Sequence, residues 1–146
     1  WAFAEFEALC RLAQLGAPVP YPVQVSGTEV LLEFLGDADV TAAPRLAEVS
    51  GGAHDLGDAF AQVVEIMRTL AVAGFAHGDL SAYNLLMHEG RVRVIDLPQI
   101  VDLIANPQGL DLLHRDCVNI CDWFARRRVP CDAEELFAEL VASSYA

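Results

Sequence analysis

The chain has 146 residues, 54% of them hydrophobic and 21% charged, which is typical of one globular domain and excludes a disordered segment. No apolar run approaches the roughly 20 residues that cross a bilayer, so we expect no membrane association and a cytoplasmic location. The net charge of −12 argues against direct binding of nucleic acid, because phosphate contacts require clustered cations.

Two features of the chain point to a missing part. It begins at Trp1 rather than Met, and all nine of its cationic residues are Arg. We therefore expect a piece of a longer protein, in which any chemistry that needs a Lys draws it from outside these residues.

The first elements are predicted from periodicity and from proline. Apolar residues at helical spacing predict a helix over residues 3–13, and alternate prolines after Gly16 forbid helix and predict an extended connector. Two short strands follow, over residues 23–25 and 30–34, around a turn. Residues 36–57 are rich in Gly, Ala, Asp and Pro without a clear period, which indicates a linker.

The second half has stronger patterns. An apolar stripe over residues 60–71 predicts a helix that ends at Gly74. Strands over 85–87 and 92–95 should form a hairpin around a turn that contains Gly. A helix from about residue 111 should end near the cluster Arg126 to Arg128, whose charge complements the helix dipole. Asp132, with Glu135 three residues later, predicts a capping box that opens a last helix.

The four cysteines allow three interpretations. His114, Cys117 and Cys121 are spaced so that they share one helical face, and zinc is conceivable there, although a complete site needs four ligands. A free Cys is also a common small core residue. We favour the core interpretation over zinc, and zinc over a disulfide.

One loop carries the chemistry. Residues 77–84 read HGDLSAYN, which matches the kinase catalytic loop H-R-D-L-x-x-x-N, and the predicted hairpin that follows ends at Asp96, where kinases place a metal-binding Asp. Asp79 can accept the proton of an attacking hydroxyl or orient it. Asn84 and Asp96 offer oxygen ligands for Mg²⁺. His77 is expected to hold the loop by hydrogen bonds rather than to act in acid–base chemistry.

Each of these residues also has a simpler interpretation. Asp79 could be a turn carboxylate, Asn84 a turn residue and Asp96 a cap at a strand end. Taken together, these simpler interpretations leave the order and spacing of the motif unexplained. The pattern therefore favours phosphoryl transfer, in which catalysis consists of positioning and charge neutralisation.

The chain resembles the RIO family of atypical serine/threonine protein kinases. The resemblance rests on the HGDLSAYN loop and on further motifs along nearly the whole chain: Trp1-Ala2 with Glu5-Phe6, VPYPV (19–23), LLEFLGD (31–37), AAPRL (42–46), VIDLPQIVD (94–102) and HRDCVNI (114–120). It implies an α+β, protein kinase-like fold with a mostly helical C-lobe, a short β-hairpin and a remnant of the N-lobe. The expected parts are an N-lobe remnant over 1–35, a hinge or linker over 36–57 and a C-lobe over 58–146.

The resemblance also implies ATP as a substrate and Mg²⁺, or Mn²⁺, as the metal. It assigns Asp79 as the catalytic residue and Asn84 and Asp96 as metal ligands, and in this family the metal-binding Asp can also accept phosphate. The nucleotide is expected to meet the hinge at Glu33 and Leu35.

Two further nucleotide contacts and one ion pair are implied. Leu86 and Ile95 are expected to pack against the adenine. Glu5, rather than Glu7, resembles the helix Glu that pairs with the ATP-binding Lys of the family.

The chain also departs from the family pattern. The phosphate-covering loop and its Lys should lie upstream of Trp1, so we expect this segment alone to bind ATP poorly and to be inactive. The two N-terminal strands should expose an edge that favours self-association. Gly78 replaces the Arg that reads an activation-loop phosphate in many kinases, and Ser81 stands where many place a Lys. The protein substrate, or a ribosome-associated target, is not readable from the sequence.

Two other classes of function share part of this pattern. Small-molecule phosphotransferases of the aminoglycoside or choline kinase type use a similar H-G-D-L loop, but with H-P-G-N where this chain has residues 81–84. They also favour Gly after the metal-binding Asp, where this chain has Leu97. A pseudokinase-like binding module fits the missing Lys but not the intact Asp79, Asn84 and Asp96.

Overall fold

The computed structural model describes the residues of several separate stretches: 10, 11, 14, 22–26, 29–32, 44–48, 53–88, 90–94 and 100–145. The chain divides into two compact units, one formed by 1–49 with 83–98 and the other by 50–82 with 99–146. Each unit is described by itself.

The first unit contains two β-hairpins. In the first, β1 (Pro22–Ser26) pairs antiparallel with β2 (Glu29–Leu32), with an irregularity between Pro22 and Gln24. An irregularity at this position is expected, because Pro has no N–H to donate to the ladder. Two strands are therefore confirmed in this part of the chain, while the predicted strand residues 33 and 34 lie outside the described residues.

The second hairpin lies directly after the candidate catalytic loop. Strand β4 (Leu85–His88) pairs with β5 (Arg91–Val94), and Leu85 lies opposite Val94. The turn contains Gly90 at φ +77, a left-handed conformation that favours glycine. The 3-10 helix η1 (Leu46–Glu48) contacts β4. The core of this part of the unit consists of Leu46, Leu85, Val92 and Val94.

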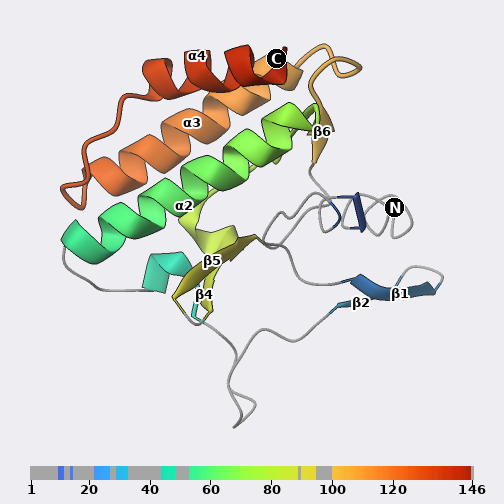
Figure 1. The fold of residues 1–146 in the computed structure, drawn as a ribbon, viewed down its shortest axis with the longest axis horizontal. Coiled ribbons are helices and arrows are strands. Elements are labelled where there is room, and N and C mark those ends of the chain that lie inside the picture. Colours follow the sequence, from blue (N-terminus) through green and yellow to red (C-terminus); the bar gives the residue numbers. More distant parts are fainter. Residues whose placement is uncertain are drawn as a thin grey trace, which may run out of the picture. The chain divides into compact units, whose positions relative to one another are not determined.

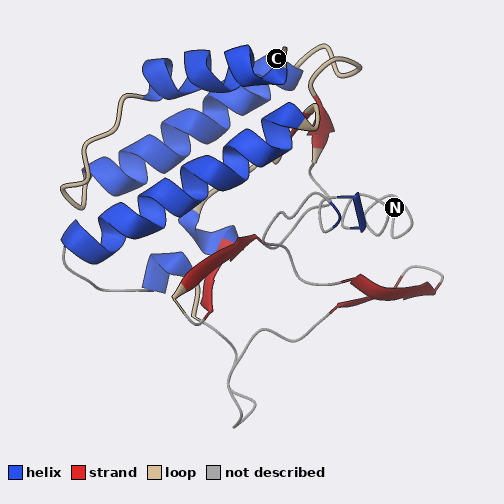
Figure 2. Cartoon of the chain, in the orientation of Figure 1, coloured by secondary structure: helices blue, strands red, loops and turns tan. Residues whose placement is uncertain are grey.

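The second unit is a group of three helices with a two-stranded ribbon. Helices α2 (Ala53–Val72), α3 (Gly109–Ala125) and α4 (Ala133–Ser144) lie side by side (Figure 1). Strand β3 (Phe75–Ala76) pairs antiparallel with β6 (Val101–Asp102) beside the helices (Figure 2). The predicted apolar stripes are buried at the shared interface, through Val63, Met67, Leu70, Leu113, Ile120, Phe124, Leu136 and Leu140.

The helix ends follow the sequence signals. After α2, Gly74 adopts φ +88, and its N–H donates to the Ala71 carbonyl, as expected of a glycine that ends a helix. At the start of α4, Asp132 Oδ1 accepts the N–H groups of Glu134 at 2.9 Å and Glu135 at 3.2 Å, which confirms the predicted N-cap. Helix α2 begins at Ala53, before the predicted end of the linker at residue 57.

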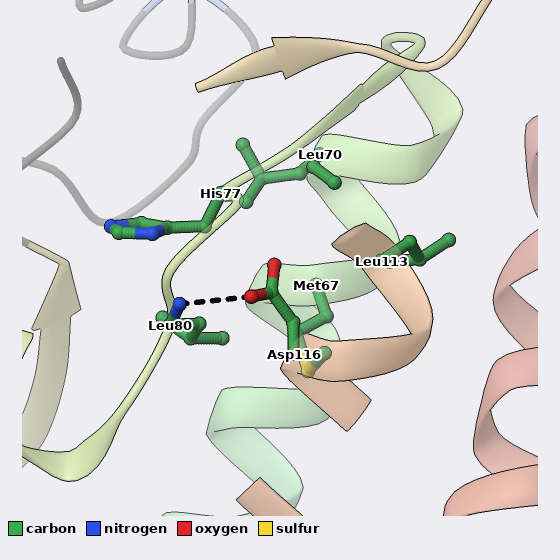
Figure 3. Close-up of a pocket in the computed structure, with 7 residues that line it drawn as sticks. Met67, Leu70, His77, Leu80, Leu113 and Asp116 are labelled. Carbon is green, nitrogen blue, oxygen red and sulfur yellow. Dashed lines mark hydrogen bonds between the residues drawn. The ribbon is translucent and has the colours of Figure 1, made fainter. Parts of the chain in front are cut away.

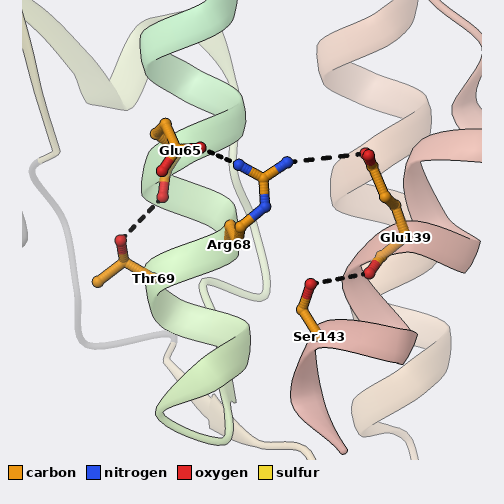
Figure 4. Close-up of polar contacts among 5 residues, drawn as sticks. All are labelled: Glu65, Arg68, Thr69, Glu139 and Ser143. Carbon is orange, nitrogen blue, oxygen red and sulfur yellow. Dashed lines mark hydrogen bonds and ion pairs between the residues drawn. The ribbon is translucent and has the colours of Figure 1, made fainter. Parts of the chain in front are cut away.

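Polar contacts connect α2 to α4. Figure 4 shows Arg68 of α2 between Glu65 of the same helix and Glu139 of α4. Its Nη1 pairs with Glu65, and its Nη2 lies 3.8 Å from Glu139 Oε2. Exposed pairs of this kind contribute at most about 1 kcal/mol to stability, so the packing of the helices depends mainly on their apolar faces.

The cysteines correct one prediction. Cys121 of α3 and Cys131, just before α4, form a disulfide with a Cα–Cα distance of 5.3 Å, so the least favoured of the three interpretations holds for this pair. Cys117 is free and fully buried. Burial and the neighbouring Asp116 and Glu134 carboxylates raise the pKa of its thiol to about 12, which fits the core interpretation.

The contact between α3 and α4 also involves His114. Its Nε2 lies 2.5 Å from Glu134 Oε1, and its ring packs edge-on against Phe137. Both partners belong to α4. His114 and Cys121 therefore both serve the helix interface, and the disulfide removes Cys121 from the zinc ligands that the spacing suggested.

The arginine cluster ends α3. Arg127 donates from Nη1 to the Trp123 carbonyl at 3.0 Å, and its guanidinium lies 3.8 Å from the centre of the Trp123 ring. The N–H groups of Arg128 and Val129 donate to the Ala125 and Phe124 carbonyls, which is a Schellman motif. The predicted position of the cluster at the helix end is confirmed, while its role as a complement to the helix dipole stays a prediction.

Replacing Arg128 by Gly should raise the free energy of unfolding. Arg128 has φ +68, and a residue with a Cβ pays about 1 kcal/mol or more for this conformation. We expect Arg128→Gly to stabilise the chain by about 1 kcal/mol in urea unfolding. The matched variant Arg126→Gly should instead lower stability, because Arg126 has φ −62 and glycine gains nothing there. Equal effects from both variants would contradict this account.

Other predictions meet the structure only in part. The first predicted helix, over residues 3–13, falls almost entirely outside the described residues. In this region only residues 10, 11 and 14 are described, and all three are helical. No helix in the described part of the chain is long and apolar enough to cross a membrane. The α+β class with a mostly helical second half is confirmed, while the proposed lobe boundaries stay a prediction.

Candidate active site

The loop of residues 77–84 joins β3 to β4 and alternates between buried and exposed side chains. His77, Leu80 and Ala82 are at most 2% exposed. The Asp79 side chain, between the first two, is 68% exposed. Buried neighbours thus anchor the loop on both sides of Asp79 and leave its carboxylate accessible to solvent.

The loop backbone is bound by a carboxylate of α3. Asp116 Oδ2 accepts the Gly78 N–H, and Asp116 Oδ1 accepts the Leu80 N–H, both at 2.9 Å. Figure 3 shows the Asp116 carboxylate directed from α3 at the backbone of Leu80. Each oxygen therefore holds the amide on one side of Asp79, and Asp116 itself is 1% exposed.

Burial of Asp116 affects its ionisation. Loss of solvation raises the pKa of this carboxyl above its usual value, while the N–H donors of Leu80 and Gly78 and the nearby His77 and Arg115 oppose the rise. Desolvation is the largest of these causes. A carboxyl at this position is therefore costly to bury, and the two backbone bonds are the reason it is tolerated.

The peptide before Asp79 is held at both ends. Gly78 has φ +92, which suits a residue without a side chain. Its carbonyl accepts a hydrogen bond from Arg115 Nη2, and the Asp79 N–H donates to His77 Nδ1 at 3.2 Å. The bond from the Asp79 N–H to His77 Nδ1 confirms that His77 holds the loop.

A small pocket lies beneath the loop and is part of the core. It is lined by Met67, Leu70, Ala76, His77, Leu80, Leu113 and Asp116 (Figure 3). Its lining is almost wholly apolar, and it does not admit a water-sized sphere. Leu80 therefore acts as a hydrophobic anchor between α2 and α3, and this pocket is not a ligand site.

The other predicted site residues are described only in part. Asn84 ends the 3-10 turn η2 (Ala82–Asn84) and is 8% exposed, and Leu86 lies in β4. Both belong to the first unit, whereas Asp79 belongs to the second. Five predicted residues lie outside the described residues: Glu5, Glu33, Leu35, Ile95 and Asp96. The convergence of Asp79, Asn84 and Asp96 stays a prediction.

Within the described stretches, no three His, Cys, Asp or Glu side chains come together as a possible metal site. This finding does not extend to Asp96, and Asn84 is of a different residue type. The oxygen donors of Asn84 and Asp96 fit Mg²⁺ by their chemistry, since this ion prefers carboxylate and carbonyl oxygens.

Sequence reasoning assigned no role to Arg115 or Asp116. The signal was present, because Asp116 lies in the apolar stripe of α3, three residues after Leu113 and four before Ile120. A charged residue on the buried face of a helix requires a partner. The sequence alone does not reveal that this partner is the backbone of a loop 38 residues away.

Known proteins that are similar to this chain belong to one family of protein kinases. A family model described as the RIO domain matches residues 1–136. The RIO-type serine/threonine-protein kinase Rio1 of Haloferax volcanii is 38% identical over 137 residues, which are 94% of this chain and 46% of that protein. The serine/threonine-protein kinase rio1 of Schizosaccharomyces pombe is 36% identical over 132 residues, 90% of this chain and 26% of that protein.

A human relative shows the same partial coverage. Serine/threonine-protein kinase RIO3 is 35% identical over 127 residues, which are 86% of this chain and 24% of that protein. The chain thus spans less than half the length of these curated relatives.

Proposed function

Because the chain belongs to the RIO family of serine/threonine protein kinases, we propose that the protein containing it transfers the γ-phosphate of ATP to a Ser or Thr hydroxyl of a protein substrate. The observation that carries the proposal is the exposed Asp79 carboxylate on a loop whose adjacent amides are bound by Asp116. This is the arrangement that a positioned catalytic carboxylate requires.

The proposed role of Asp79 follows from its surroundings. Its side chain is exposed while its backbone is held by hydrogen bonds on either side. A hydroxyl that approaches the loop can donate a hydrogen bond to the carboxylate and is thereby oriented toward the phosphorus. Phosphoryl transfer gains most of its acceleration from such positioning and from charge neutralisation.

The metal and nucleotide contacts are proposed from the family pattern. Asn84 and Asp96 would hold Mg²⁺, which supplies charge neutralisation at the phosphates when bound. Glu33 and Leu35 would meet the adenine at the hinge, and Leu86 and Ile95 would pack against it. The chain has no Lys, so the cation that anchors ATP in kinases would come from outside these residues.

Replacing Asp79 by Asn tests the proposal. In the full-length protein, this change keeps the size of the side chain but removes its ability to accept a proton. We expect kcat for ATP-dependent phosphate transfer to fall by about 10²- to 10⁴-fold. The measurement is transfer of labelled γ-phosphate to a Ser/Thr-containing protein substrate, and to water, with Mg²⁺ present.

Controls separate loss of chemistry from loss of folding. Asp122→Asn changes an exposed Asp on α3 and should leave the transfer rate unchanged. Because Asp79 is exposed, its Asn variant should melt at the temperature of the wild type. Transfer that persists at the wild-type rate in Asp79→Asn would refute the catalytic role. Transfer to water alone would identify an ATPase.

A further inference from the structure

Arg115 of α3 faces the loop next to Asp79. Its Nη2 donates to the Gly78 carbonyl and lies 3.9 Å from Asp79 Oδ1. The side chains of Arg115 and Asp79 are 53% and 68% exposed. A single guanidinium nitrogen therefore contacts the peptide before Asp79 and lies close to the Asp79 carboxylate.

Two adjacent residues of α3 bind both polar groups of Gly78. Asp116 accepts the Gly78 N–H at 2.9 Å, and Arg115 donates to the Gly78 carbonyl. Gly78 has no side chain with which to fix its own orientation, and its φ of +92 lies in a region that only glycine enters freely. Helix α3 therefore binds the peptides on both sides of Gly78, and Arg115 holds the carbonyl end of the Gly78–Asp79 peptide, whose N–H donates to His77.

The charge of Arg115 has a second effect. The loop residues 77–84 contain neither Lys nor Arg, and Gly78 and Ser81 stand where many kinases place cations. The structure supplies a cation to this loop from a helix instead. A guanidinium is permanently charged and carries five N–H donors in a planar fork, so it can serve two acceptors at once.

An exposed ion pair at this distance contributes little to stability. The pair therefore has a small thermodynamic effect on folding, while its position beside Asp79 allows a large effect on catalysis. A displacement of a reacting group by about 1 Å can cost about 10²-fold in rate.

We infer that Arg115 is a positioning residue for phosphate transfer: it fixes the peptide that precedes Asp79 and holds the Asp79 carboxylate toward the substrate. This inference rests on the proposed function. It adds a cation from outside the catalytic motif to the machinery of that site.

The kinetic test compares three variants of the full-length protein. Arg115→Ala should lower kcat by about 10- to 100-fold with little change in KM for ATP, because the proposed nucleotide contacts lie elsewhere in the chain. Arg115→Lys should recover part of this loss, since it keeps the charge and a donor but lacks the planar fork. Arg126→Ala, an exposed Arg just after the same helix, should behave as wild type.

A second measurement does not depend on activity. In Arg115→Ala, hydrogen exchange of the peptide covering residues 77–81 should become about tenfold faster, as expected when one charge-assisted hydrogen bond is lost. Exchange in the α4 helix should stay unchanged, and Arg126→Ala should show no effect in either segment.

The outcomes separate this inference from the proposed function. Unchanged exchange of residues 77–81 in Arg115→Ala overturns the positioning role, whether or not the wild type transfers phosphate. Faster exchange with a wild type that shows no transfer leaves Arg115 as the residue that holds the loop and refutes the proposed function. If Arg115→Ala loses activity and Lys restores none of it, the charge plays no part and the inference is wrong.

Discussion

Replacing Asp116 by Ala should lower the free energy of unfolding by about 2–4 kcal/mol, since each buried N–H group left without a partner costs about 1–3 kcal/mol. The Gly78 and Leu80 amides both lose their acceptor in this variant. Phosphate transfer by the full-length protein should fall together with stability, because the backbone on both sides of Asp79 is released. Urea unfolding and a transfer assay well below the melting temperature measure the two effects.

Two matched variants test whether the lost bonds to the loop cause the loss of stability in Asp116→Ala. Asp116→Asn keeps one acceptor oxygen but turns an amide NH₂ toward the other backbone donor, so its loss should be about half that of Ala. Asp122→Ala removes an exposed Asp from the same helix and should stay within about 0.5 kcal/mol of the wild type. If Asp116→Ala were as stable as Asp122→Ala, the two bonds to the loop would not contribute to the fold.

The stability of the wild type relative to Asp116→Asn should change with pH in one direction. Burial raises the pKa of Asp116 in the folded state above the reference value of 3.8, so the folded chain keeps this proton to a higher pH than the unfolded chain. The associated stability is fully present below pH 3.8 and is lost as pH rises through the folded-state pKa. As pH rises from 3.8 through the folded-state pKa, the wild type should therefore lose stability relative to Asp116→Asn. A relative gain would mean that the folded-state pKa is lowered.

Truncating Phe124 to Ala should destabilise the second unit by about 3–5 kcal/mol, the usual cost of removing a large aromatic side chain from a core. Phe124 is fully buried, and its ring lies 5.0 Å from Phe60 of α2 and 4.9 Å from Trp123, in both cases edge-on. The side chain thus packs α3, which carries Arg115 and Asp116, against α2. Chemical denaturation followed by circular dichroism measures the loss.

The control variant Phe124→Leu keeps more of the side-chain volume than Phe124→Ala does. Phe124→Leu should cost about half as much, because it leaves a smaller cavity but loses both ring contacts. At the half-buried Phe137 of α4, the change to Ala should cost less than Phe124→Ala. Equal losses at positions 124 and 137 would show that burial does not determine the effect.

The sequence predicted part of the candidate site because the residues of the kinase-like motif are contiguous. In residues 77–84 the identities and spacing of His77, Asp79 and Asn84 match a known chemical pattern without any knowledge of the fold. The role of His77 as a loop holder is confirmed by its bond to the Asp79 N–H. Arg115 and Asp116 could not be assigned in this way, because their partners lie 36 to 38 residues away in sequence.

The cysteines show a similar limit. Helical spacing correctly placed Cys117 and Cys121 on the buried face of α3. Whether either one forms a disulfide depends on how the segment after α3 returns to start α4, and the Schellman motif at Arg128 brings Cys131 back to Cys121. Local propensity predicts where a helix ends but not the direction of the chain after it.

Within the described residues, the sequence by itself determined the segments that form α2, α3, α4 and the two β-hairpins, and where α4 is capped. It also placed a kinase-like motif between the first of these helices and the second hairpin. These properties depend on interactions between residues close in the chain, such as periodic burial, capping and turn formation. Only the tertiary structure decided that Asp79 is exposed while its neighbours are buried, and that α3 supplies both a carboxylate and a guanidinium to the loop. The physical reason is that a buried charge and an unpaired backbone amide are each costly alone, and only the fold brings the two together.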